Sequence, residues 1–302
     1  MIKRTLYFGN PAYLSTKNSQ MVVNIPNAQG LDNISSNTIA IEDIGIVILD
    51  HSQITITHSL MASLIQHNVA LISCDDSHLP VGMMLNLDGN SLQTQKTRFQ
   101  LQASQPLVKQ LWQQTIKAKI YNQAMLLQQI GKPCENLLRW VDEVKSGDTD
   151  NLEARAAAYY WKQIFTHIPD FTRYREGPAP NHLLNYGYAI LRGIVARALV
   201  GSGLMPTVGI HHRNQYNAYC LADDIMEPYR PFVDWLVYEM TMELTDISEI
   251  TKEIKTKLLG IATVDVTIET LRSPLMVGVQ KTTASLAKCF EGTTRKILYP
   301  ER

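Results

Sequence analysis

The sequence has few cysteines and no segment that marks a secreted or membrane protein. Its 302 residues include four cysteines, and these are too far apart to form the paired spacing of a zinc site or a redox motif. Isolated thiols are typical of a reducing compartment, so we expect a cytoplasmic protein. No apolar run approaches the roughly 20 residues that span a bilayer. Residues 1–15 also lack the apolar stretch of a signal peptide, and we expect no membrane partner.

Common nucleotide-binding and hydrolase motifs are also absent. There is no Gly-x-x-x-x-Gly-Lys phosphate loop, and Gly201-Ser202-Gly203 is not followed by the remaining glycine of a dinucleotide fingerprint. Neither His-Glu-x-x-His nor Gly-x-Ser-x-Gly occurs. The function of the chain therefore cannot be assigned from any of these nucleotide-binding or hydrolase motifs.

The chain has no excess of charge of either sign, with 28 basic and 28 acidic residues. This balance argues against a simple polyanion binder, but the charges are unevenly distributed. Residues 89–134 hold six basic residues and no acidic one, and residues 271–302 hold six basic and two acidic residues. Such local surfaces can bind phosphates even on a neutral molecule. Solvated helix faces explain each patch equally well.

The first 90 residues have the pattern of a small β domain. Short apolar or alternating runs are separated by Asn, Pro, Gly and Ser turns. The runs begin at Thr5, Met21, Thr38, Gly45 and Val69. One helix is predicted between them, over residues 57–65, with Leu60, Met61, Leu64 and Ile65 on one face.

Beyond a turn-rich linker over residues 86–91, the pattern becomes helical. Good helix formers fill residues 92–130, and apolar residues recur at helical spacing further on. The later helices are predicted over residues 152–166, 183–200 and 232–244. We therefore predict an α+β protein, with a β-rich domain over residues 1–86 and a larger, all-helical domain over residues 92–302.

The most promising chemical groups lie in two neighbouring segments, Gly209-Ile210-His211-His212-Arg213 and the run that holds Asp224 and Glu227. Two carboxylates three positions apart on a helix point the same way, and a loop could bring the imidazole back onto them. Carboxylates with an imidazole are a hard ligand set that suits Mg²⁺ or Mn²⁺.

A structural explanation competes with a metal site. Asp-x-x-Glu is also the spacing of an Asp-capped helix with a glutamate at its third position, and the spacing alone favours capping. The nearby Pro228 and Pro231 strengthen that alternative. Glu153 lies beside large aromatic residues, where it could be an inward-pointing ligand or simply an acid in the first turn of a helix.

Several segments, taken together, resemble CRISPR-associated protein 1, the family of spacer-acquisition integrases. Any one of them is weakly specific, but all of them occur in order over nearly the whole chain. They are IAIEDIGIVILD from Ile39, QITITHSL from Gln53, KAKIYNQAMLL from Lys117, NLEARAAAYYW from Asn151, LLNYGYAILRGIVARAL from Leu183, GLMPTVGIHHRNQYN from Gly203 and LADDIMEPYRPFVD from Leu221. The Leu-Ala-Asp-Asp-x-x-Glu form and the short N-terminal domain look most like type II members, which are found beside a single large effector nuclease.

The resemblance implies Glu153, His212 and Glu227 as ligands of Mg²⁺ or Mn²⁺, with Asp224 as a nearby acid that supports the metal or its water. His211 is the alternative ligand, because the adjacent histidines leave the register open by one residue.

The family's pattern is broken at one place. Ala179-Pro180-Asn181 stands where many members carry an acid, which leaves Asn181 and Asn185 as structural or site-wall residues.

The activity that the resemblance implies is the insertion of spacer DNA into a CRISPR array. The 3′-hydroxyl of an incoming fragment would attack a phosphodiester, and attack by water would give endonuclease activity. Such transesterification needs no nucleotide cofactor. The candidate contacts to double-stranded DNA are Arg213, Arg230, Lys117 and Lys119, although an ordinary ion pair is an equal alternative for each arginine.

The partners that the resemblance implies are a second copy of the chain, paired through the N-terminal domains, and CRISPR-associated protein 2. Two dimers would bridge a dimer of that protein in a heterohexamer, and the effector nuclease is a further candidate partner. Two rivals remain, a non-catalytic DNA-binding scaffold and a metal-dependent hydrolase of a small substrate.

Overall fold

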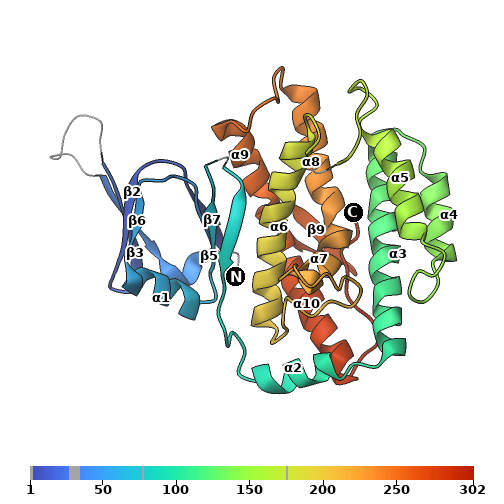
Figure 1. Ribbon diagram of the computed structural model, residues 1–302, viewed down its shortest axis with the longest axis horizontal. Coiled ribbons are helices and arrows are strands. Elements are labelled where there is room, and N and C mark those ends of the chain that lie inside the picture. Colours follow the sequence, from blue (N-terminus) through green and yellow to red (C-terminus); the bar gives the residue numbers. More distant parts are fainter. Residues whose placement is uncertain (1–2, 27–34, 77, 175) are drawn as a thin grey trace. The chain divides into compact units, whose positions relative to one another are not determined.

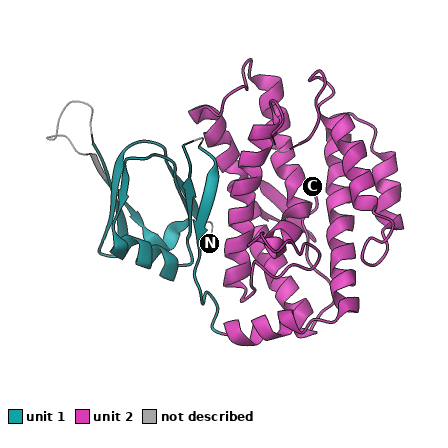
Figure 2. Cartoon of the chain, in the orientation of Figure 1, with its two compact units in different colours: residues 1–91 teal, residues 92–302 magenta. Residues whose placement is uncertain are grey.

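The computed structural model describes residues 3–26, 35–76, 78–174 and 176–302. The chain forms two compact units, Met1–Ser91 (unit 1) and Leu92–Arg302 (unit 2) (Figure 2). The boundary between them falls at the end of the turn-rich stretch over residues 86–91, where the composition changes. Unit 1 is rich in strands and unit 2 is mainly helical, so the predicted α+β class is confirmed.

Among its described residues, unit 1 contains two four-stranded sheets and one α-helix (Figure 1). In the first sheet, three parallel strands are joined by one antiparallel edge strand. Its order is β1 (Arg4–Phe8), β5 (Ile44–Leu49), β7 (Ala70–Cys74), β8 (Pro80–Met84). The second sheet has the order β4 (Ser35–Ala40), β3 (Gln20–Ile25), β2 (Ala12–Lys17), β6 (Ile54–Ile56).

The core of unit 1 is aliphatic. β5 is a nearly continuous apolar run, and its residues 44–48 are all buried, which is typical of a central strand covered on both faces. The helix α1 (His58–Gln66) begins at Thr57, whose hydroxyl accepts a hydrogen bond from the Leu60 amide, and it buries Leu60 and Leu64 against the strands. The short turn η1 (Ile41–Asp43) leads into β5.

Unit 2 contains nine α-helices within its described residues, together with two short 3₁₀ turns and a hairpin. The helices are α2 (Gln93–Leu101), α3 (Gln105–Gln129), α4 (Glu135–Glu143), α5 (Leu152–Ile164), α6 (Asn181–Gly201), α7 (Cys220–Met226), α8 (Arg230–Glu243), α9 (Lys252–Leu259) and α10 (Leu275–Glu291). The turns are η2 (Glu227–Tyr229) and η3 (Gly260–Thr263).

The prediction that this region is all helical is wrong at one place. β9 (Asp265–Ile268) and β10 (Leu271–Pro274) form an antiparallel hairpin, with Glu269 in a left-handed conformation at its turn. Val266 and Ile268 of β9 are buried, and the Val266 side chain lies where a Cβ at Gly278 of α10 would be. Alternation of buried and exposed residues over four positions is enough for a short strand but too brief to recognise in the sequence.

Two helices organise unit 2. α6 is buried along nearly its whole length and packs against α7, α8 and α10, which explains why it is apolar all round. By length and composition α6 could cross a membrane, but 83% of its apolar window is buried inside the protein, as in a core helix. The 25-residue helix α3 is capped by the Ser104 hydroxyl and has α4 and α5 packed along it (Figure 1). Its middle part carries side chains of the candidate site.

Candidate active site

The ammonium group of Lys119 lies between two of the predicted ligands. Its Nζ is 2.7 Å from Oε1 of Glu153 and 2.6 Å from Oε2 of Glu227. The three side chains come from the middle of α3, the start of α5 and the η2 turn, so the fold brings together residues that are distant in the sequence. The two carboxylates therefore converge on one position that already holds a positive charge.

Glu153 is positioned by the start of its helix. The Asp148 carboxylate accepts hydrogen bonds from the amides of Leu152 and Glu153, each at 2.9 Å, and so caps α5. This places Glu153 in the first turn, where the helix dipole favours an acid. The alternative of an acid in the first turn of a helix is thus correct for the Glu153 backbone. The Glu153 side chain also points at Lys119, and 23% of the surface of that side chain is exposed.

Glu227 is deeply buried and is paired with two cations. Besides Lys119, it contacts Arg230, whose Nε lies 2.9 Å from its Oε1. Burial acts to raise the pKa of Glu227, but the charges of Arg230 and Lys119 outweigh it, and the pKa lies below its ordinary value. The turn that holds Glu227 is fixed to α3, because the Asn122 side chain donates a hydrogen bond to the Pro228 carbonyl. Glu227 is therefore a fixed, ionised carboxylate.

Asp224 binds the loop that carries the two histidines. It is fully buried, and its carboxylate accepts hydrogen bonds from the amides of Ile210, His211 and His212, at 2.7, 2.9 and 3.2 Å. Gly209 allows this close approach, because a Cβ there would lie 2.4 Å from the His212 carbonyl oxygen. The helix-capping alternative is wrong, since α7 begins at Cys220 and Asp224 lies within it.

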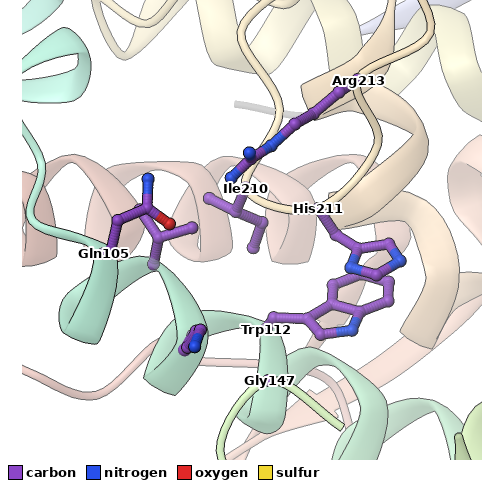
Figure 3. A pocket seen from close by; sticks show the side chains of 8 residues that line it. Gln105, Trp112, Gly147, Ile210, His211 and Arg213 are labelled. Carbon is purple, nitrogen blue, oxygen red and sulfur yellow. The ribbon is translucent and has the colours of Figure 1, made fainter. Parts of the chain in front are cut away.

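The two histidines have different surroundings. His212 Nδ1 is 2.5 Å from Asp224 Oδ1, and this hydrogen bond is the main cause of the raised pKa of His212. The negative charges of Glu227 and Glu153 raise it further, so all three acids act on this imidazole. His211 instead stacks on the indole of Trp112, with ring centroids 4.0 Å apart (Figure 3). The geometry thus supports His212 rather than His211 as the site histidine.

The side chains suit a divalent metal by type, although their present arrangement does not form a finished ligand set. Within the described ranges, no three His, Cys, Asp or Glu side chains are grouped closely enough to hold an ion as they stand. The Lys119 ammonium lies where the carboxylates of Glu153 and Glu227 meet. A histidine whose Nδ1 is held by a carboxylate presents Nε2 to a metal, which is the usual arrangement around ligating histidines.

Two predicted DNA contacts lie in ion pairs instead of on an open surface. Lys119 is buried between two glutamates, so its prediction as a surface contact to the DNA backbone is wrong. Arg230 pairs with Glu227, and its guanidinium lies 4.6 Å from the centre of the Tyr188 ring, which matches the ion-pair alternative. Lys117 is half-buried on α3, and Arg213 is exposed beside the site.

Arg213 lines a cavity of about 330 Å³ beside the histidine loop (Figure 3). The wall combines two cationic side chains with an aromatic stack and several apolar or neutral residues. The lining residues are Gln105, Val108, Lys109, Trp112, Gly147, Ile210, His211 and Arg213. Lys109 belongs to the predicted basic run of residues 89–134, whereas Trp112 was not predicted, because a lone tryptophan in a helix is usually part of the core.

A buried network that the sequence did not reveal lies behind Arg230. The hydroxyls of Tyr160 and Tyr188 donate hydrogen bonds to the two oxygens of Asp234, and burial raises the pKa of Asp234 to about 6. Nothing in the spacing of these residues marks them as partners, since they come from α5, α6 and α8.

The asparagines at the break in the family's pattern have a structural role. Arg173 donates hydrogen bonds to the side-chain oxygens of Asn181 and Asn185, at 3.0 and 2.9 Å. Asn181 is fully buried and also donates to the carbonyls of Thr172 and Pro178. Both residues therefore hold the segment before α6 in place.

Comparison with known proteins gives a consistent family. The family model described as "CRISPR associated protein Cas1" matches residues 6–253. The "CRISPR-associated endonuclease Cas1" of Neisseria meningitidis serogroup C (strain 8013) is 34% identical over 304 residues, which cover all of this chain and 97% of the relative.

Solved structures share the fold at low sequence identity. A casposase bound to its integration product is 20% identical with a TM-score of 0.79, and the match covers 98% of this chain and 92% of that one. A chain of a Cas6-RT-Cas1–Cas2 complex is also 20% identical, with a TM-score of 0.74, over 98% of this chain and 36% of that one. The family model and the full-length relative together confirm the resemblance seen in the sequence, and the chain belongs to the Cas1 family of CRISPR-associated proteins.

Proposed function

We propose that this protein is a metal-dependent DNA integrase and endonuclease that inserts spacer DNA into a CRISPR array. The observation that carries the proposal is the convergence of Glu153 and Glu227 on one cation position, with His212 held by Asp224 within their electrostatic reach. The name of the Neisseria meningitidis relative, an endonuclease, and the integration product bound to the casposase support an activity on DNA.

Each acid has a distinct role in this proposal. Glu153 of α5 and Glu227 of the η2 turn supply carboxylate oxygens, and Asp224 fixes the ring of His212 so that its Nε2 is the third ligand atom. When bound, Mg²⁺ or Mn²⁺ would act as a Lewis acid on the scissile phosphate. Arg230 holds the second oxygen of Glu227 and keeps that carboxylate from rotating away.

The reaction is the attack of a DNA 3′-hydroxyl on a phosphodiester, in which one P–O bond forms and one breaks. Water in place of the hydroxyl gives hydrolysis. Neither reaction needs a nucleotide cofactor, which agrees with the absence of a phosphate loop. Arg213 and Lys109, both exposed beside the histidine loop, are the best placed contacts to the DNA backbone, with Lys117 as a further candidate.

The proposed partners are double-stranded DNA, a second copy of the chain paired through unit 1, and CRISPR-associated protein 2. The solved Cas6-RT-Cas1–Cas2 complex, which shares this fold, supports that partner. We further propose the heterohexamer of two dimers around a dimer of CRISPR-associated protein 2, the effector nuclease as an additional partner, and a cytoplasmic location.

The test is a strand-transfer assay with a fluorescent DNA fragment and a plasmid that carries a CRISPR repeat. The assay is run in Mg²⁺, Mn²⁺ or chelator. We expect transfer by the wild type only with metal, and loss of transfer in Glu153→Gln and Glu227→Gln. Glu143→Gln is the matched control, because Glu143 is an exposed acid on α4.

A non-catalytic DNA-binding scaffold is the alternative, and it predicts the opposite pattern. Both glutamate variants would then retain every DNA-dependent property of the wild type, and chelator would change no DNA product. Transfer that persists in either variant overturns the ligand assignment.

A further inference from the structure

Lys119 is an unusual neighbour for two metal ligands. Only 10% of its side-chain surface is exposed, and its ammonium makes close contacts to both Glu153 and Glu227. Two carboxylates at hydrogen-bond distance favour the charged form of this ammonium. The two carboxylates and the lysine thus form a buried ion cluster.

We propose that Lys119 is an internal competitor of the metal, which holds the two carboxylates in the metal-free protein and must be displaced when a divalent ion binds. This inference rests on the proposed function, because it assumes that Glu153 and Glu227 are the ligands. The ligand of the site is a hard divalent cation such as Mn²⁺ or Mg²⁺.

Distance and charge make the two cations mutually exclusive. The Lys119 nitrogen lies at hydrogen-bond distance from one oxygen of each glutamate, and a metal bound to the same oxygens would lie about 2 Å from them. Both cations would then be only a few ångströms apart in a buried site, where repulsion between like charges is strong. The ammonium therefore has to leave before a metal can bind these same two oxygens.

The surroundings allow the lysine side chain to move while the carboxylates stay in place. Lysine has an unbranched, flexible stem, whereas the backbone of α3 is fixed by hydrogen bonds from Asn122 to the carbonyls of Pro228 and Pro300. Glu227 keeps its contact with Arg230, and Glu153 is held by the cap at the start of α5. The exchange thus replaces one cation by another in a preformed carboxylate pair.

The test measures metal binding directly, by electron paramagnetic resonance titration of Mn²⁺ into wild type, Lys119→Met and Lys119→Gln. Removal of the competing charge should tighten Mn²⁺ binding by about tenfold, because the ion no longer has to displace an ammonium. Lys162→Met removes an exposed lysine from α5, the helix of Glu153, and should change the affinity less than about twofold.

A purely structural role for Lys119 predicts a different result, since the variants would lose stability while their Mn²⁺ affinity stayed equal to that of the wild type or fell. Either outcome overturns the inference. Lys119→Arg, which keeps a cation at the position, guards against loss of folding, and it should bind Mn²⁺ no more tightly than the wild type. Tighter binding by the arginine variant would also contradict the competition.

Failure of the inference and failure of the proposed function give different results. If Mn²⁺ binding is lost in Glu153→Gln but unchanged in Lys119→Met, the ligand assignment stands and the competitor role is refuted. If wild type and Lys119→Met both bind no Mn²⁺, and transfer persists in chelator, the proposed metal-dependent function itself is refuted.

Discussion

Units 1 and 2 bury different kinds of side chain. Among the described residues of unit 1, one charged side chain is buried, that of Asp50, and the rest of the core is aliphatic. The described part of unit 2 buries eight: Lys119, Asp148, Arg197, Asp223, Asp224, Glu227, Asp234 and Lys255. Burial of charge costs free energy unless it is paired, and three of these eight, Lys119, Asp224 and Glu227, belong to the candidate site. The comparison supports the proposal that unit 2 carries the chemistry.

The largest effect is expected from Asp224→Ala. The substitution leaves three backbone amides of the histidine loop without their acceptor and frees the His212 ring, so the free energy of unfolding should fall by about 3–5 kcal/mol, with loss of strand transfer. Urea unfolding and the transfer assay measure both effects. Asp223→Ala is the control, because Asp223 is also buried but pairs with a half-exposed Arg192. This substitution should lower the free energy of unfolding by less than Asp224→Ala does. Equal costs for the two variants would contradict the account of the loop.

A core variant of unit 1 tests whether the two units have separate roles. Leu64→Ala removes a fully buried side chain of α1 and should lower the free energy of unfolding of unit 1 by about 2–4 kcal/mol. Mn²⁺ binding should be unchanged at temperatures where unit 1 is folded. Loss of Mn²⁺ binding under those conditions would break the separation of roles between the units.

The pH dependence of Asp234 tests whether buried charge in unit 2 carries a cost. Its pKa is raised from 3.8 to about 6 by burial, so folding favours the protonated form. The stability that this form contributes is complete below pH 3.8 and is lost as the pH rises through about 6. Relative to Asp234→Asn, the free energy of unfolding of the wild type should fall by about 2–3 kcal/mol between pH 4 and pH 7, as measured by urea unfolding. A flat difference curve would show that the carboxyl titrates normally.

The smallest effects are expected at the cavity beside the site. Lys109→Ala and Arg213→Ala should each weaken DNA binding by about 0.5–1 kcal/mol and lower the salt dependence by about one counterion. Fluorescence anisotropy at several salt concentrations measures both quantities. Lys252→Ala, on the exposed face of α9, is the control and should bind DNA as the wild type does. Unchanged affinity in the two cavity variants would remove this surface from the DNA path.

The sequence predicted the fold class, because strong periodicity marks the long elements. β5 and α6 were recognised from continuous apolar residues, and α1 from its apolar face. Strands β2, β6 and β8 were not predicted. β6 has only three residues, β2 ends in polar residues, and β8 contains Pro80 and Gly82, which are uncommon in strands. The helix α7 was not predicted, because the residue spacing favoured Asp224 as a helix cap. In the structure the Asp224 carboxylate instead accepts hydrogen bonds from the histidine loop.

The acids and the histidine of the candidate site could be predicted from the sequence, whereas the buried position of Lys119 could not. Family resemblance pointed to Glu153, His212 and Glu227, which residue spacing could not place together. Lys119 was predicted as a surface contact because it lies in a basic run, but the run is helical and turns this one lysine inward, onto Glu153 and Glu227. Pairing of this kind depends on three-dimensional packing and leaves no local signal.

Anomalous diffraction from crystals of the wild-type protein soaked with Mn²⁺ would locate the metal relative to Glu153, Glu227 and His212. We expect a single strong peak bonded to carboxylate oxygens of Glu153 and Glu227 and to Nε2 of His212, with the Lys119 ammonium moved away. A peak at any other position, or no peak in a protein that still transfers DNA strands with chelator present, would contradict it.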